Sequence, residues 1–386
     1  MDRQNTEMIY FDNACTSFPK PPAVLEAIKN YCLHVGSSPG RSGHRLALEA
    51  ARLLFEAREN LARLFNVPKS ERIVFTANAT EALNLAITGL LSEGDHVIVP
   101  STEHNSVMRP LDHLSRKRFI DLSIIPCSEE GDIDLDSLRR SITKKTRLIA
   151  VNHASNVTGT IAPLGEIRQI AGDILLLVDA AQSAGAVQVD TEALGIDLLA
   201  FTGHKSLCGP QGTGGLFIRE GIDLRPLRRG GTGSRSESWE HPDFLPDKYE
   251  SGTPNTVGIA GLGAGVRFVL DQGVDAIREH ETALTGRLLE GLKKIEEVTV
   301  YGPGKPERRT ATVSLTVERK EVSEVGYRLD REFDIMTRVG LHCNPGTHKA
   351  IGTFPHGAVR LSLGYFNTDQ EVVRVVEALH GIATGT

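Results

Sequence analysis

Two neighbouring segments decide the fold that we predict: LLLVDAAQSAG at residues 175–185 and LLAFTGHKSLCGPQGTGG at residues 198–215. Each begins with an apolar run, and the second continues into a glycine-rich turn. Runs that are apolar throughout, rather than alternating, are typical of strands covered on both faces, as in parallel sheets. Ligands of such sheets bind at the carboxyl ends of the strands, so the polar residues after these runs are candidates for chemistry.

Further short β-type runs alternate with helical patterns along the chain, which indicates an α/β protein. The seven runs are residues 72–75, 96–99, 122–126, 148–152, 175–178, 198–201 and 215–218. They predict a large domain with a mostly parallel seven-stranded sheet. Apolar positions at helical spacing predict an amphipathic helix over residues 46–65 with one face toward the core.

A smaller α+β domain is predicted at the C-terminal end. The regular pattern stops within residues 228–256, which are rich in Gly, Ser and Pro and contain the only tryptophan, Trp239. Helices are then predicted at residues 259–271, 274–295, 322–333 and from 368 onward, with strands at 311–317 and 358–363. We therefore predict a large domain over residues 15–255 and a small domain over residues 256–386 together with residues 1–14.

Composition narrows the class of protein. The 386 residues are 40% hydrophobic and 24% charged, with a formal net charge of −6, so they offer no global attraction to nucleic acid or anionic lipid. The polar start and the absence of a long apolar run predict a cytoplasmic protein without a membrane partner. The five cysteines are never spaced as C-x-x-C, which argues against a disulfide framework and a zinc site, so no metal is expected.

Lys205 and Asp179 are the sharpest candidates for chemistry, since each follows a predicted buried strand. Alone, a loop lysine is normally solvated and an aspartate after a strand is normally a cap. Together they predict pyridoxal 5'-phosphate, with the lysine forming the Schiff base and the aspartate pairing with the pyridinium nitrogen.

Three other strand ends carry polar residues that suit this cofactor. In FTANATEALN, the strand-to-helix turn Asn78-Ala79-Thr80 can present free N–H groups and a hydroxyl to a phosphate. In VIVPSTEHNS, His104 could cover one face of the ring and shuttle protons. In VNHASNVTGT, Asn156 could bond the ring hydroxyl.

The motifs YFDNA, NATEALN, EHNS, HASNVTG, VDAAQSAG and FTGHKS, in this order, resemble the class V pyridoxal-phosphate enzymes of fold type I. The resemblance covers essentially the whole chain. ESGTPNT, RVGLHCNP and VRLSLGYFNT are similar to cysteine desulfurases, especially the group related to selenocysteine lyases.

The resemblance implies a role for each matching residue. Lys205 would bind the cofactor covalently, Asp179 would pair with the ring nitrogen, and His104 would stack on the ring. Other cofactor contacts would come from Ala79, Thr80, Asn156, Gln182, Thr202, His204 and, in the neighbouring subunit's site, Thr253. Arg360, aided by Asn156, would bind the substrate carboxylate, although an arginine in a β-type run is otherwise an edge-strand surface charge.

Cys343 falls where this family carries its nucleophilic cysteine, in a Gly/Pro-flanked loop over residues 339–345. Arg338 and His342 are the nearby cationic candidates that could favour its thiolate. Attack on the substrate sulfur would leave a persulfide on Cys343 and release alanine. Cys15, in YFDNACTS where alanine is expected, is interpreted as a small apolar substitute.

The main hypothesis is therefore a homodimeric cysteine desulfurase that converts L-cysteine to L-alanine and passes sulfur to an acceptor protein. The rivals are a selenocysteine lyase acting on L-selenocysteine and a class V aminotransferase. A non-enzymatic alternative is a regulatory domain that binds pyridoxal phosphate.

Overall fold

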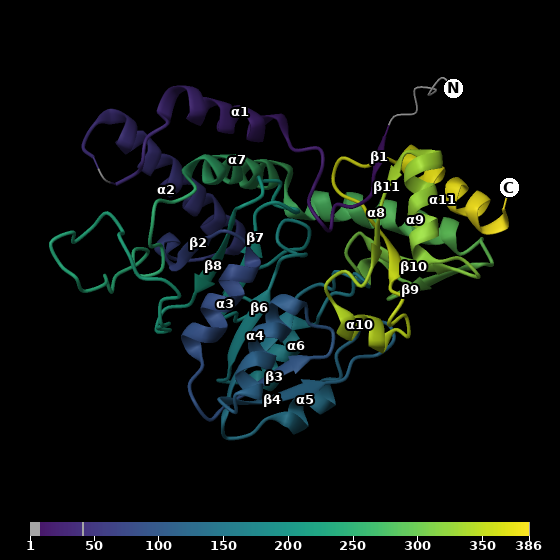
Figure 1. Ribbon diagram of the computed structural model, residues 1–386, viewed down its shortest axis with the longest axis horizontal. Coiled ribbons are helices and arrows are strands. Elements are labelled where there is room, and N and C mark those ends of the chain that lie inside the picture. The colour runs from purple at the N-terminus through teal and green to yellow at the C-terminus, as the bar shows by residue number, and fades with distance from the viewer. Residues whose placement is uncertain (1–7, 41, 386) are drawn as a thin grey trace.

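The computed structural model describes residues 8–40 and 42–385, which form a larger and a smaller layered unit (Figure 1). The larger unit is built on a sheet of seven strands: β2 (Ile73–Thr76), β3 (Asp95–Pro100), β4 (Ile120–Ile125), β5 (Thr146–Asn152), β6 (Leu175–Asp179), β7 (Leu198–Thr202) and β8 (Gly214–Ile218). Their order across the sheet is β2-β8-β7-β6-β5-β3-β4. All seven predicted runs are strands, with ends that differ from the prediction by at most two residues.

Strand β8 is the exception in this parallel sheet. It pairs antiparallel with both β7 and β2, whereas the other neighbouring strands are parallel. The cause is the connection: β7 and β8 are joined by the short turn that contains Lys205, and only an antiparallel pair can be joined without a crossover. The mostly parallel α/β sheet predicted from the sequence is confirmed.

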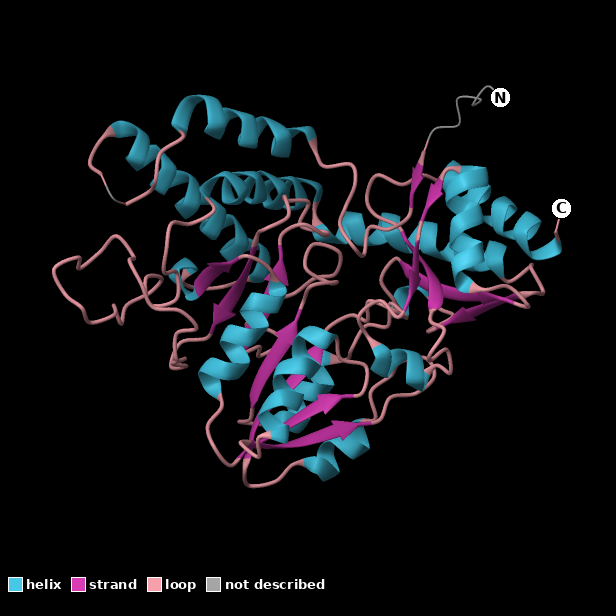
Figure 2. Ribbon diagram, viewed as in Figure 1, coloured by secondary structure: helices cyan, strands magenta, loops and turns pink. Residues whose placement is uncertain are grey.

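Helices cover both faces of this sheet (Figure 2). They are α1 (Pro22–Asn30), α2 (Arg45–Phe65), α3 (Ala79–Leu90), α4 (Asn105–Arg116), α5 (Leu135–Ser141), α6 (Leu164–Ala171) and α7 (Thr256–Gln272), with a π-helical turn at Tyr31–Val35 and a 3-10 turn at Ser70–Arg72. Side chains of α3 and α4 join the apolar core on one face, and those of α2, α5, α6 and α7 join the core on the other. Successive residues of β5, such as Ile149 and Ala150, belong to opposite cores, as the two-residue period of a strand requires.

The smaller unit is an antiparallel sheet packed against helices, which confirms the predicted α+β domain. Its strands are β9 (Val298–Tyr301), β10 (Thr312–Val317), β12 (Arg338–Gly340) and β13 (Ala358–Ser362), in the order β12-β13-β10-β9. Its helices are α8 (Val274–Leu292), α9 (Val322–Phe333), α10 (Pro345–Ala350) and α11 (Asp369–Thr384), with a 3-10 turn at Pro306–Arg308. A parallel pair of short strands, β1 (Ile9–Tyr10) and β11 (Ile335–Met336), flanks this sheet.

The chain passes from one core to the other within α8: Ile277 still packs in the core of the large sheet, whereas Leu284 belongs to the core of the smaller unit. The predicted domain boundary at residue 256 stays a prediction. Apolar side chains of α7, including Leu262 and Val266, belong to the core that α2 shares with the large sheet. The start of the described chain belongs to the smaller unit, although the large unit follows it in sequence. Ile9 and Phe11 are part of the core of the smaller unit. The predicted small-domain residues 1–7 lie outside the described part of the chain.

Residues 219–255 contain no helix or strand, and Trp239 is fully exposed within them. The segment is tied down near its end, where Glu250 pairs with the Arg58 guanidinium at 2.8 Å and accepts the amide of Phe75 at 2.7 Å. Across the described residues, no single helix is both long and apolar enough to cross a bilayer; the bent pair α7 and α8 reaches that threshold only when taken together.

Candidate active site

A cavity of about 100 Å³ lies at the carboxyl ends of β5, β6 and β7, and we call it the lysine cavity. It is several times larger than the roughly 10–15 Å³ that one water molecule needs. Of the twelve predicted site residues, nine line it: Ala79, Thr80, His104, Asn156, Asp179, Gln182, Thr202, His204 and Lys205. The other three, Thr253, Cys343 and Arg360, are not among its lining residues.

Lys205 and Asp179 come together because their strands are neighbours: β6 ends at Asp179, and Lys205 follows the end of β7. Burial lowers the pKa of the Lys205 amine to about 8, and the charge of Asp179 opposes this shift. Burial raises the pKa of Asp179, although Lys205 and the amide of Ala181, which donates to Oδ1 at 2.9 Å, lower it. A lysine with a lowered pKa is a better nucleophile toward carbonyl groups.

Hydrogen-bond donors gather in another part of the lysine cavity. Asn78 caps α3 and accepts the amide of Glu81 at 2.9 Å, which leaves the first amides of the helix, those of Ala79 and Thr80, without a helical acceptor. The Thr80 and Ser106 hydroxyls share a 2.7 Å hydrogen bond, and buried Nδ1 of His204 has no partner. Such a group of donors suits an anion like a phosphate.

His104 is neutral in this cavity. Burial first, and then the charges of Lys205 and Arg338, lower its pKa to about 4. Its Nδ1 accepts the amide of Ser106 at 3.1 Å and so caps α4, which places the remaining ring proton on Nε2. A neutral ring suits packing on a planar ligand, while the predicted proton transfer by His104 stays a prediction.

Glu103, which the sequence analysis did not single out, is a buried carboxyl next to His104. Its Oε1 accepts the amide of Asn152 at 2.7 Å, whereas its Oε2 has no partner. Burial raises the pKa of Glu103 well above its ordinary value, and the charge of Asp179 raises it further. The only sequence signal for Glu103 is its place in the EHNS motif.

The turn that carries Lys205 is held by residues that sequence reasoning also missed. The carbonyl of His204 accepts hydrogen bonds from the Thr16 hydroxyl at 3.0 Å and the Lys20 ammonium at 2.8 Å. The Ser17 hydroxyl donates to the carbonyl of Lys205 at 2.8 Å. These polar residues directly follow the YFDNA motif, which is the only hint of their role in the sequence.

Cys343 lies on a tight turn between β12 and α10. His342 and Cys343 both have left-handed backbone angles, with φ of 51° and 59°. The next residue, Asn344, is fully buried and anchors the turn: its Oδ1 accepts the amide of Thr347 at 3.1 Å, and its Nδ2 donates to the carbonyl of Thr102 at 2.8 Å. The predicted loop is thus docked on the end of the large sheet.

Asn156 joins this turn to the loop after β5. Its Nδ2 donates to the carbonyl of His342 at 2.7 Å, and its Oδ1 accepts Nδ2 of Asn344 at 3.2 Å. The side-chain amide is therefore engaged by the residues on both sides of Cys343. The predicted contacts of Asn156 with the cofactor and the substrate stay predictions.

The exposed Cys343 thiol lines a hollow whose walls include Thr80, His104 and Ser106, which also line the lysine cavity. Nη2 of Arg338 lies 3.9 Å from its Sγ, so a cation does stand beside the thiol. The prediction that His342 is a second cation beside the thiol is wrong. Burial first, and then the charge of Arg360, lower the pKa of His342 to about 2, so its ring is neutral.

Arg360 is buried in β13, between β12 and β10, which excludes the alternative of an edge-strand surface charge. Its Nη2 pairs with Asp12 at 2.8 Å, and its Nη1 donates to the carbonyl of Asn156 at 3.0 Å. Its Nε is buried without a partner. The guanidinium is thus held in one orientation by Asp12, a residue that the sequence analysis did not single out, and by the Asn156 backbone.

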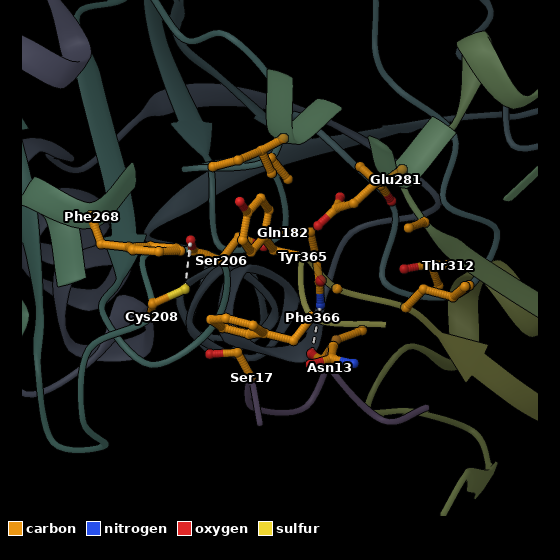
Figure 3. Close-up of a pocket in the computed structure, with 17 residues that line it drawn as sticks. Asn13, Ser17, Gln182, Ser206, Cys208, Phe268, Glu281, Thr312, Tyr365 and Phe366 are labelled. Carbon is orange, nitrogen blue, oxygen red and sulfur yellow. Dashed lines mark hydrogen bonds between the residues drawn. The ribbon is translucent and has the colours of Figure 1, made fainter. Parts of the chain in front are cut away.

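Two predicted cofactor residues also face other hollows. Thr253 is exposed and lines a separate hollow beside Arg228 and Glu250, so it does not reach the lysine cavity of its own chain. Gln182 lines the lysine cavity, but its Nε2 donates to the carbonyl of Ala14 at 3.0 Å. Gln182 also lines a small pocket of about 30 Å³ between the two domains, the inter-domain pocket, with Cys208, Glu281, Phe268 and Tyr365 on its wall (Figure 3).

Comparison with known proteins identifies the family. The family model described as Aminotransferase class-V matches residues 9–375. A protein of Methanothermobacter thermautotrophicus named "Probable cysteine desulfurase" is 36% identical, with 97% of this chain and 94% of the relative covered. A Pyrococcus abyssi protein with the same name is 36% identical, with coverages of 95% and 92%.

Solved structures agree in fold over nearly the full length. The apo structure of a cysteine desulfurase from Thermococcus onnurineus superposes with a TM-score of 0.92 at 35% identity, covering 98% of this chain and 95% of the other. A cysteine desulfurase from Escherichia coli gives 0.86 at 27% identity, with coverages of 96% and 94%. A family model that spans almost the whole chain, together with these relatives, shows that the chain belongs to the aminotransferase class-V family.

Proposed function

We propose that the protein is a cysteine desulfurase that uses pyridoxal 5'-phosphate to convert L-cysteine to L-alanine and leaves the sulfur on Cys343 as a persulfide. One observation carries the proposal. The exposed Cys343 thiol stands beside Arg338, in a hollow that shares a wall with the lysine cavity. A nucleophilic thiol next to a carbonyl-reactive lysine suits sulfur abstraction, whereas transamination needs no thiol.

The lysine cavity fits the cofactor. When bound, pyridoxal phosphate supplies an electron-withdrawing ring that stabilises negative charge next to the substrate nitrogen. Lys205 would hold it covalently, and the buried Asp179 carboxyl, which uses one oxygen for the Ala181 amide, would face the ring nitrogen. A buried carboxylate is costly without a cationic partner, and a protonated ring nitrogen is such a partner.

The phosphate would lie where unpaired donors face the cavity. The amides of Ala79 and Thr80 open α3, and Thr202 and His204 line the same cavity. The partnerless Nδ1 of His204 is the strongest sign of a missing hydrogen-bond partner, because buried polar atoms are nearly always hydrogen-bonded.

Arg360 would bind the carboxylate of the substrate. A guanidinium carries five N–H donors in a rigid plane, and its fork matches a carboxylate. Asp12 and the Asn156 carbonyl hold its two terminal nitrogens, so its plane is set before the substrate arrives. Cys343 would then attack as a thiolate: a bond forms to the substrate sulfur, the bond between that sulfur and carbon breaks, and the carbon fragment leaves as alanine after protonation.

The test compares Cys343→Ala with Cys32→Ala, which removes an exposed cysteine of the π-helical turn. We expect Cys343→Ala to lower alanine formation from L-cysteine by about 10²-fold or more, because the nucleophile is lost. Cys32→Ala should behave as the unchanged protein. Retained turnover of L-cysteine by Cys343→Ala would overturn the persulfide mechanism.

The same assay separates the rival functions. A selenocysteine lyase predicts that Cys343→Ala keeps its turnover of L-selenocysteine, since the C–Se bond breaks more readily than C–S. An aminotransferase predicts transamination that depends on a keto acid. A regulatory protein predicts cofactor binding, seen as a yellow chromophore, without turnover of either amino acid.

The proposal extends to an assembly. It includes a cytoplasmic homodimer in which Thr253 of one subunit binds the cofactor phosphate in the other, and an acceptor protein that collects the sulfur. The exposure of Thr253, outside the lysine cavity of its own chain, supports this arrangement. The exposure of Cys343 supports delivery of sulfur to another protein.

A further inference from the structure

A second thiol lies beside the Cys343 turn. The two terminal nitrogens of Arg338 contact two different sulfur atoms: Nη1 is 3.5 Å from Sγ of Cys15, and Nη2 is 3.9 Å from Sγ of Cys343. The two cysteines lie near opposite ends of the chain, and the fold brings them to one guanidinium. The contact with a charged group contradicts the interpretation of Cys15 as a small apolar substitute for alanine.

The position of Cys15 is set by its backbone. Its amide donates to the carbonyl of Asp12 at 3.0 Å, and the preceding residue, Ala14, donates to the Ser362 hydroxyl at 2.9 Å and accepts Nε2 of Gln182 at 3.0 Å. The side chain of Cys15 is half-buried, whereas that of Cys343 is exposed. Cys15 is thus a fixed, partly sheltered thiol, and Cys343 is the accessible one.

Cys15 also lies within electrostatic reach of the lysine cavity. Burial lowers the pKa of Lys205 to about 8, and the charges of Asp179 and Cys15 both oppose this shift. Cys15 likewise raises the pKa of Arg360 against the lowering by burial. The thiol therefore stands among the groups that we assign to the cofactor and the substrate.

The other three cysteines, which all lie in the described part of the chain, do not share this contact. Cys208 is buried in the inter-domain pocket, where burial raises the pKa of its thiol to about 11. Cys127 is half-buried, with its sulfur 3.4 Å from the Thr102 hydroxyl. Cys32 is exposed in the π-helical turn after α1.

We propose that Cys15 is a second sulfur carrier, which takes the outer sulfur atom from the Cys343 persulfide. This inference rests on the desulfurase function proposed above. The Cys15 thiolate forms a bond to the outer sulfur, the S–S bond to Cys343 breaks, and the electron pair of that bond leaves on Sγ of Cys343. A persulfide is consumed and another is formed, so the step needs no oxidant or reductant.

Arg338 is placed to assist this exchange. The reaction moves one negative charge from Sγ of Cys15 to Sγ of Cys343, and one guanidinium lies against both atoms. A cation that contacts both the attacking and the leaving sulfur stabilises the charge at the start and at the end of the transfer. The outer sulfur also extends the reach of Cys343 by one S–S bond, about 2 Å.

The experiment uses the full-length protein with pyridoxal phosphate and a small molar excess of L-cysteine, quenched within the initial burst, with no acceptor protein and no thiol other than the substrate. Alanine released in the initial burst is counted per chain, and alkylated peptides are examined by mass spectrometry without reductant. We expect a persulfide first on Cys343 and then on Cys15. Cys15→Ala should lower the burst amplitude about twofold, because one of two carriers is lost. Cys32→Ala is the matched control, since Cys32 is more exposed than Cys15.

Each other outcome contradicts the transfer of sulfur from Cys343 to Cys15. A persulfide on Cys343 alone, with an unchanged burst in Cys15→Ala, shows that Cys15 takes no sulfur. Equal labelling of Cys15 and Cys32 shows modification by free sulfur species in solution. A Cys15–Cys343 disulfide with release of sulfide shows attack at the inner sulfur. If no alanine forms and Cys343 stays unmodified, the proposed function itself fails, and that result differs from all of these.

Discussion

The lysine cavity and the inter-domain pocket meet at Gln182, yet they bury ionisable side chains in opposite ways. The lysine cavity holds an amine and a carboxyl, Lys205 and Asp179, near each other, and each opposes the effect of burial on the other's pKa. In the inter-domain pocket the Glu281 side chain points into the pocket, whose wall also carries Tyr365 and, on the opposite side, Phe268 (Figure 3). No hydrogen bond or ion pair of its carboxyl is found among the described residues.

This difference in how ionisable groups are buried distinguishes the lysine cavity, which suits a ligand, from the inter-domain pocket, where a buried carboxyl costs stability. In the lysine cavity, opposite charges and unpaired donors face a space that a ligand can fill, so burial tunes reactivity. In the inter-domain pocket, burial raises the pKa of Glu281 to about 8, and only the charge of Arg278 lowers it. Glu281 therefore meets the cost of burial by keeping its proton at neutral pH. A substitution in the lysine cavity should therefore change activity, and one in the inter-domain pocket should change stability.

Removing the amine of the lysine cavity has the largest expected effect. Lys205→Ala should lower alanine formation from L-cysteine by about 10⁴-fold or more, because it removes the group that would bind the cofactor covalently. The measurement is the rate of alanine release together with the yellow chromophore of the bound cofactor. Lys117→Ala, an exposed lysine at the end of α4, is the control. A yellow, active Lys205→Ala protein would contradict the assignment.

Neutralising the carboxyl of the inter-domain pocket should change stability rather than activity. The pKa of Glu281 is about 8 in the folded chain, against an ordinary glutamate pKa of 4.5, so the folded state binds more protons between these limits. Stability contributed by this group is present at low pH and is lost as pH rises through the window. Glu281→Gln should therefore exceed the unchanged protein in free energy of unfolding by on the order of 4 kcal/mol at about pH 9.

The check is urea unfolding at about pH 5 and about pH 9. The advantage of Glu281→Gln should be small at the lower pH and should grow at the higher one. Glu290→Gln, an exposed change on the same helix, should give no such divergence. Parallel pH–stability curves for Glu281→Gln and the unchanged protein would show that Glu281 does not hold an extra proton in the folded state.

Loosening the Cys343 turn, which lines the hollow next to the lysine cavity, has the smallest expected effect. Asn344→Ala removes the cap of α10 and the bond to the Thr102 carbonyl, which should lower the free energy of unfolding by about 1–3 kcal/mol. We also expect slower persulfide formation on Cys343, with cofactor absorbance retained because the lysine cavity is intact. Asn344→Asp, which keeps the capping oxygen, should lose less stability. Equal losses in both variants would assign the effect to the lost donor alone.

Much of the lysine cavity could be predicted because its residues follow strands. Asp179 comes directly after an apolar run, Lys205 and Asn156 come in the short loops that follow such runs, and parallel strands bring their carboxyl ends to one edge. The approximate location of such residues therefore follows from strand order alone. The proximity of Arg338 to Cys343 could also be predicted from the sequence, since both residues lie in one short motif.

Contacts between distant segments could not be predicted in the same way. The hydrogen bonds from Thr16, Ser17 and Lys20 to the Lys205 turn join residues far apart in the chain, and no local pattern signals them. The neutrality of His342 has the same origin, because burial by other segments, rather than the identity of its neighbours in sequence, sets its pKa.

The sequence by itself determined the α/β class, the seven strands and the residue types at their ends, because periodicity and turn chemistry act over a few residues. Only the tertiary structure decided which side chains meet. It placed Cys15 and Cys343 on one guanidinium, buried the Glu281 carboxyl where no described residue gives it a hydrogen bond, and docked Asn344, next to Cys343, on the carbonyl of Thr102. Burial and long-range contact depend on how separate segments pack, and local sequence carries no record of that packing.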